Sequence, residues 1–289
     1  MNEVNRSYQV VEFSEERRFM AAYQELKSGR HCMYALLEVD VTRIRQYIEE
    51  YKARTGETLS FTGYLAFCLG QAVDEDKTVQ AYRKGRKQLV LFDDVDVGIM
   101  VELKQGEKRL LTGHVIQAAN HKTFLEIHQE IRNVQSSEAP PSAASASWFR
   151  SAMLLPWPLS SLFKAAFNIM LRREPTLVTS MAGTVGISSV GMFGKGHAGW
   201  GISSGTHVLD LIVGGIAPRL AQMDGRIETR QVLSLTILFD HDVIDGAPAA
   251  RFTRRLVELI ENGYGLDEDE CLSANDTEAS VVQTEQAPV

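Results

Sequence analysis

The chain has 289 residues, 44% of them hydrophobic, so it can bury a substantial core in one large or two modest domains. Its formal net charge is −7, and this excess lies wholly in residues 266–289, because the first 265 residues carry 30 basic and 30 acidic side chains. This balance argues against a nucleic-acid-binding surface. The three cysteines are far apart, which argues against a disulfide framework and against a metal site.

The first half of the chain predicts alternating helices and strands. The spacing of apolar residues and of turn residues predicts these elements in chain order: a helix at 15–27, a strand at 34–39, helices at 41–52 and 59–73, one or two strands at 89–103, a strand at 110–116 and a helix at 122–134. The helix at 59–73 is apolar enough to lie in the core. The pattern indicates an α/β fold of mixed order.

Two unusual segments follow. Residues 136–147 are rich in Ser, Ala and Pro and predict a flexible loop. Residues 148–171 are aromatic and apolar and carry a helical stripe. Their most hydrophobic window, residues 151–163, is interrupted by Pro156 and Pro158 and is too short to span a bilayer. We expect this insert to pack against the domain or a neighbouring subunit. A substrate lid, a membrane-surface contact and a partner contact are the alternatives.

A strand-to-helix corner near the C-terminus carries the strongest pattern. Residues 232–239 predict a buried strand, and the residues from 247 onward follow a helical period that ends at 262–263. His241 lies where the strand ends, and a histidine can accept and return a proton near neutral pH. Asp245 lies where a side chain can cap the helix, and Gly246 permits a tight backbone. Taken alone, this segment fits an active-site histidine and a hydrogen-bonded packing histidine equally well.

The motif at residues 234–252, SLTILFDHDVIDGAPAARF, resembles the closing segment of the catalytic domain of the acyltransferase component of 2-oxoacid dehydrogenase complexes. It also resembles the related chloramphenicol acetyltransferase. Residues 184–194, TVGISSVGMFG, are similar to the family's strand that carries an oxyanion-stabilising hydroxyl. Three further segments match in the same order: an early core helix at 59–72, a central strand at 95–101, and an apolar strand running into a glycine turn at 202–215.

The resemblance covers roughly residues 15–264 and implies a fold. That fold is an α/β, chloramphenicol acetyltransferase-like two-layer sandwich with a mixed β-sheet, assembled as a trimer. We therefore expect residues 1–265 to form the catalytic domain. Residues 266–289 are acidic, poor in apolar residues and without aromatics, and we expect them to be a disordered tail.

The resemblance also assigns roles in thioester transfer. His241 would be the general base, and Ser188 would donate its hydroxyl to the tetrahedral oxyanion. Ser189 is the alternative donor, since neighbouring residues of a strand point to opposite faces and only one of the two can serve.

The remaining site residues have supporting roles. Asp245 would order the loop by pairing with Arg17 or Arg18 in the first helix, rather than carry a proton, and Gly246 would shape the corner. His197 and His207 lie near the matched strands and are interpreted as structural.

The implied activity moves an acyl group between coenzyme A and a dihydrolipoyl thiol. The matched region begins almost at Met1, so we expect no lipoyl attachment on this chain and a lipoyl domain supplied in trans. The active site would lie between subunits of a homotrimer or of a larger trimer-based assembly. The N-terminus lacks an apolar signal, which together with the separated cysteines favours the cytoplasm.

Three alternative functions remain open. The chain could be a free-standing, chloramphenicol acetyltransferase-like enzyme that acylates a small hydroxyl or amine acceptor. It could be a catalytically silent trimeric scaffold. A peptide-condensing enzyme of the same superfamily is disfavoured, because a second histidine normally precedes the motif where Asp240 stands here.

Overall fold

The computed structural model describes residues 9–26, 30–105, 108–137, 147–189, 196–223 and 225–266. The chain divides into two compact units, one of Met1–Gly29 with Pro141–Leu171 and the other of Arg30–Pro140 with Arg172–Val289. The predicted loop at 136–147 lies mostly outside the described residues, and so does the predicted acidic tail, except for Leu266.

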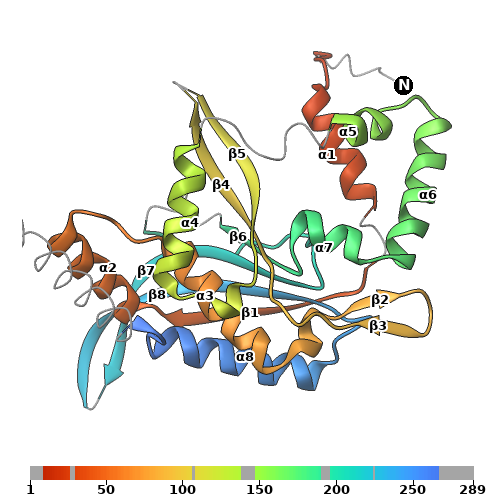
Figure 1. Cartoon of the computed structure of the whole chain (residues 1–289). Helices are drawn as coiled ribbons and strands as arrows, with labels where there is room; N and C mark the ends of the chain where they lie inside the picture. The colour runs from red at the N-terminus through yellow and green to blue at the C-terminus, as the bar shows by residue number, and fades with distance from the viewer. Residues whose placement is uncertain are drawn as a thin grey trace, which may run out of the picture. The chain divides into compact units, whose positions relative to one another are not determined.

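The larger unit is built on a six-stranded sheet with the strand order β1-β8-β7-β6-β4-β5 (Figure 1). The strands are β1 (Cys32–Asp40), β4 (Val97–Gln105), β5 (Lys108–Ile116), β6 (Val185–Ser189), β7 (Leu209–Met223) and β8 (Arg226–Asp240). The short β6 runs parallel to both of its neighbours, and the other pairs are antiparallel. The predicted mixed sheet is therefore confirmed.

Helices cover one face of this sheet and make the second layer (Figure 1). They are α2 (Thr42–Thr55), α3 (Phe61–Glu75), α4 (Phe124–Ser136) and α8 (Gly246–Glu261). Because strand side chains alternate, Leu233, Leu235, Ile237 and Phe239 of β8 all enter the core between the layers. The two-layer α/β sandwich is thus confirmed.

Helix α3 lies at the centre of the helical layer, as its apolar sequence predicts. The hydroxyl of Ser60 accepts a hydrogen bond from the Gly63 N–H at 3.1 Å and caps the first turn. Tyr64, Leu65 and Leu69 are fully buried, and α3 packs against both α4 and α8. The remaining small elements of this unit are η1 (Lys77–Gln80), the hairpin β2 (Tyr82–Lys84) and β3 (Gln88–Val90), η2 (Ala119–His121) and α7 (Thr176–Ala182).

The glycine turn expected at the end of residues 202–215 is wrong. Gly214 and Gly215 lie inside β7, at the irregularity in its pairing with β8 between Val213 and Ile216. The chain at residues 197–199 crosses the strand there. A Cβ added at Gly214 would stand 2.1 Å from the Gly199 oxygen, and a Cβ added at Gly215 would stand 1.9 Å from the His197 oxygen. The two glycines are needed for this close crossing, and not for a turn.

The smaller unit contains α1 (Glu15–Leu26), α5 (Ser147–Met153) and α6 (Leu159–Arg173), whose last two residues belong to the larger unit. Its core is formed by Ala22, Phe149 and Met153, with Phe163 and Phe167 of α6 packed against them. The apolar insert at 148–171 is therefore helical and packs on α1. Within the described ranges no helix is both long and apolar enough to cross a membrane.

Candidate active site

The candidate site is the corner between β8 and α8. β8 ends at Asp240, which is buried, and its main-chain oxygen accepts hydrogen bonds from the N–H groups of Val243 and Ile244, both at 3.0 Å. Its carboxylate accepts a third bond, from the Asp242 N–H at 3.0 Å. These bonds close a tight turn, and the side chain of His241 leaves that turn 48% exposed. The predicted strand-to-helix corner is confirmed.

Asp245 lies beside the histidine. Its Oδ1 is 3.9 Å from Nδ1 of His241, and 88% of its side chain is exposed. Asp245 occupies the N-cap position of α8, but its side chain accepts no capping hydrogen bond, so the predicted side-chain cap is wrong. The carboxylate lies near the imidazole instead, where it can orient the ring.

Gly246 is the first residue of α8, and its role in shaping the corner stays a prediction. Its φ is not positive, and an added Cβ would meet no atom of the described residues within 4 Å. Within the described part of one chain, no contact therefore requires a glycine at that position.

The candidate oxyanion donors lie on β6. Val185 and Ile187 of this strand are buried in the core, whereas Ser188 is exposed and Ser189 is half-buried. Because side chains alternate along a strand, Ser189 shares the core-facing side with Ile187, and Ser188 lies on the opposite side. Of the two hydroxyls, that of Ser188 is the more open to a ligand. Residues 190–194 of the same motif lie outside the described residues.

A single chain does not bring Ser188 and His241 together. In the sheet register Ser188 of β6 pairs with Ile212 of β7, which pairs with Thr236 of β8. His241 follows Thr236 by five residues, just after the end of β8. At about 3.3 Å per residue along a strand and about 4.8 Å between strands, the two Cα atoms are about 19 Å apart. Two side chains cannot close that gap.

The arginines predicted to pair with Asp245 lie in the smaller unit. Arg17 and Arg18 are both on α1, and both are exposed. Asp245 belongs to the larger unit, and its pairing with either arginine stays a prediction.

A buried ion pair supports the strand that carries Ser188. Nδ1 of His207 donates to Oδ1 of Asp210 at 2.7 Å, and Nε2 donates to the Ala182 carbonyl at 2.9 Å. Both ring nitrogens of His207 therefore face acceptor oxygens. Burial alone would raise the pKa of Asp210, but the charge and hydrogen bonds of His207 and the Thr206 N–H hold it below its usual value. The structural interpretation of His207 is confirmed.

Sequence reasoning missed the partners of Asp242. Its carboxylate accepts hydrogen bonds from Nδ1 of His31 and from Nη1 of Arg83, both at 2.8 Å. The hydrogen bond from His31, and after it the charges of His31 and Arg83, lower the pKa of Asp242. His31 precedes β1 and Arg83 lies on β2, so no local pattern around residue 242 could have identified them.

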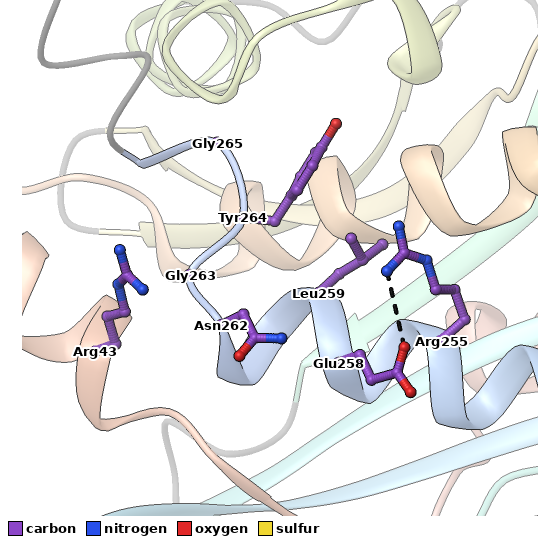
Figure 2. A pocket seen from close by; sticks show the side chains of 8 residues that line it. All are labelled: Arg43, Arg255, Glu258, Leu259, Asn262, Gly263, Tyr264 and Gly265. Carbon is purple, nitrogen blue, oxygen red and sulfur yellow. Dashed lines mark ion pairs between the residues drawn. The ribbon is translucent and has the colours of Figure 1, made fainter.

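One surface pocket lies away from this corner. It has a volume of about 330 Å³ and is lined by Arg43, Arg255, Glu258, Leu259, Asn262, Gly263, Tyr264 and Gly265 (Figure 2). It surrounds the end of α8, whereas His241 precedes the start of this 16-residue helix, which is about 24 Å long. The pocket is therefore not part of the corner. Among the described residues no group of three or more His, Cys, Asp or Glu side chains could hold a metal ion.

The model of the 2-oxoacid dehydrogenases acyltransferase (catalytic domain) family matches residues 5–141 and 173–266. The chain belongs to this family. The residues between the two matched parts, 142–172, contain the whole apolar insert.

Similar proteins are longer than the matched region. The acetyltransferase component of the Mycoplasma genitalium pyruvate dehydrogenase complex is 24% identical over 228 residues, which are 77% of this chain and 50% of that protein. The chain spans about half the length of the curated relatives it matches.

Two solved structures share the fold. Azotobacter vinelandii dihydrolipoamide acetyltransferase has a TM-score of 0.64 and 20% identity, over 91% of this chain and 96% of that one. That structure was determined to investigate a serine, a histidine and an asparagine in its catalytic mechanism. The cubic core of a pyruvate dehydrogenase multienzyme complex has a TM-score of 0.61 and 19% identity, over 91% and 95% of the two chains.

Proposed function

We propose that the chain is a coenzyme A-dependent acyltransferase that moves an acyl group between coenzyme A and a dihydrolipoyl thiol. The observation that carries this proposal is His241, half-exposed at a rigid strand-to-helix corner with the Asp245 carboxylate 3.9 Å from its ring, in a chain of this family. A histidine so placed can accept a proton from a substrate and return it.

The reaction would follow general acid–base chemistry. His241 takes the proton of the attacking thiol, and the thiolate attacks the thioester carbonyl to give a tetrahedral oxyanion. The Ser188 hydroxyl donates to that oxyanion, a contribution of about 2 to 4 kcal/mol for a well-placed donor. The oxyanion collapses, the carbon–sulfur bond of the old thioester breaks, and His241 returns the proton to the leaving thiolate.

The Azotobacter enzyme supports these roles. Its histidine and asparagine are four residues apart, as His241 and Asp245 are here. The separation of its serine from its histidine is 52 residues, which equals the separation of Ser189 from His241 and is one less than that of Ser188. The greater exposure of Ser188 favours that hydroxyl.

We propose that the site is completed by a second copy of the chain in a homotrimer, with His241 of one subunit facing Ser188 of the next. The separation of about 19 Å within one chain supports this arrangement. The sheet face opposite the helices supports it too, because Tyr34, Leu36 and Met100 on that face are 40%, 48% and 51% exposed. Solvent-exposed apolar side chains on one face of a sheet are typical of a protein–protein interface. A larger, trimer-based assembly would use the same contact.

Coenzyme A would then bind between subunits as a substrate. The described residues are accounted for by the catalytic fold and the small helical unit, so we infer that a lipoyl domain outside this part of the chain presents the thiol. A cytoplasmic location is part of the same proposal.

The test measures coenzyme A release from acetyl-CoA, with and without dihydrolipoamide. We expect His241→Ala to lower the rate at least about a hundredfold while sedimentation shows the same oligomer. Ser188→Ala should lose about as much, and Ser189→Ala should stay close to the wild type. If His241→Ala releases coenzyme A as fast as the wild type, His241 is not the general base. Release that needs a small hydroxyl or amine instead of dihydrolipoamide would favour the free-standing enzyme, and no release at all would favour the scaffold.

A further inference from the structure

The loop that carries His241 is held by two residues from other segments, which both bind the carboxylate of Asp242. Asp242, the next residue, accepts hydrogen bonds from His31 and Arg83, one on each carboxylate oxygen and each at 2.8 Å. Hydrogen bonds between charged partners are shorter and stronger than neutral ones. Three segments that are far apart in the sequence therefore meet at the residue beside the proposed base.

His31 contacts this loop twice. Its main-chain oxygen accepts the His241 N–H at 2.7 Å, while its ring donates to Asp242. The Asp240 carboxylate accepts a hydrogen bond from the Asp242 N–H. Oδ2 of the same carboxylate lies 3.9 Å from Nε of Arg30. Residues 240, 241 and 242 are thus each tied to a neighbouring segment of the larger unit.

This arrangement differs from an isolated surface ion pair. Such pairs contribute little to stability, and the exposures of 32% for Asp242, 51% for Arg83 and 78% for His31 predict a small effect on unfolding. Catalysis has a stricter geometric requirement, because a displacement of about 1 Å at a reacting group can lower a rate by about a hundredfold. A carboxylate held from two directions can set the path of the chain at His241 without much changing the stability of the fold.

We propose that Asp242 is a positioning residue for His241, and that His31 and Arg83 act through it. The inference rests on the proposed function, because it takes His241 as the base. It adds residues on β2 and before β1 to the machinery of the corner.

The experiment is a double-mutant cycle with Asp242→Ala, Arg83→Ala and the double variant, measured as kcat and KM. We expect Asp242→Ala to lower kcat by about tenfold, with KM changed by less than about twofold. Arg83→Ala should lose less, and the double variant should match Asp242→Ala, because Arg83 has no partner on the loop once the carboxylate is gone. Asp242→Asn, which keeps one acceptor oxygen, should recover part of kcat.

Arg255→Ala is the matched control. Arg255 makes an exposed ion pair with Glu75, at 2.7 Å and far along α8 from the corner, so its loss should leave kcat unchanged. An unchanged kcat for Asp242→Ala, additive losses in the cycle, or a change confined to KM would overturn the inference.

A second readout does not depend on activity. The His241 amide should exchange its hydrogen faster in Asp242→Ala than in the wild type, while amides of α3 stay unchanged. Equal exchange at His241 would overturn the inference even in a chain without transferase activity. Conversely, if His241→Ala keeps full activity, the proposed base role fails whatever Asp242 does. The two failures are therefore distinguishable.

Discussion

Gly186→Ala tests how the buried ion pair supports the strand of Ser188. An added Cβ at residue 186 would stand 2.2 Å from Oδ1 of Asp210 and 2.3 Å from Nδ1 of His207. Non-bonded atoms pack best at about 3.5 Å, so the pair would have to retreat by about 1 Å. That movement would break the 2.7 Å hydrogen bond inside the pair or the contacts that hold it.

The cost follows from two known effects. Overpacking a core costs about 1 to 3 kcal/mol, and separating a buried ion pair costs about 3 to 5 kcal/mol. The same displacement causes both, so we expect a loss of about 3 to 5 kcal/mol in the free energy of unfolding. At about 2 to 4 °C for each kcal/mol in a domain of this size, Tm should fall by about 6 to 20 °C.

Thermal unfolding followed by circular dichroism, at one fixed protein concentration, measures this change. Gly113→Ala is the matched control. Gly113 also lies on a strand, its φ is not positive, and a Cβ there would meet no atom of the described residues within 4 Å. We expect this control to shift Tm by no more than about 3 °C. Equal Tm values for the two variants would refute the steric argument.

Two further predictions concern pH and the small unit. Burial lowers the pKa of His128, whose Nδ1 accepts a hydrogen bond from the Ser60 N–H. As pH falls, this histidine therefore takes up a proton in the unfolded chain before it does so in the folded chain, and the free energy of unfolding decreases below about pH 6.5. His128→Asn should flatten urea-unfolding stability between about pH 5 and 7, and a slope equal to that of the wild type would contradict this. Phe149 is 8% exposed at the centre of the small unit, so Phe149→Ala should cost about 3 to 5 kcal/mol there. Hydrogen exchange should then rise in α1, α5 and α6 but stay unchanged in α3, and a rise in both places would show that the two units unfold together.

Much of the fold could be predicted from local patterns. The apolar run of α3 and the turn from β8 into α8 both appear in the sequence, because a helical or alternating period reflects which side of an element is buried. The family motif also led to His241, Asp245 and Ser188, the residues on which the proposed mechanism depends. Details that depend on side-chain direction were less predictable: Asp245 lies near His241 instead of capping α8.

Other features have no local signal. The glycine pair in β7 was mistaken for a turn, because its reason is a chain segment that crosses the strand in space. The partners of Asp242 come from two distant segments and could not be inferred from the corner. The small unit joins α1 to the apolar insert through Phe149 and its neighbours, which the stripe on the insert alone did not predict.

The sequence by itself determined the family, the mixed α/β class and the corner at His241, since periodicity and a contiguous motif are properties of neighbouring residues. Only the tertiary structure decided that Ser188 and His241 are about 19 Å apart in one chain, because sheet register depends on which strands pair. It likewise decided why residue 186 is a glycine and what holds Asp242. Those contacts join residues far apart along the chain, and folding alone brings them within bonding distance.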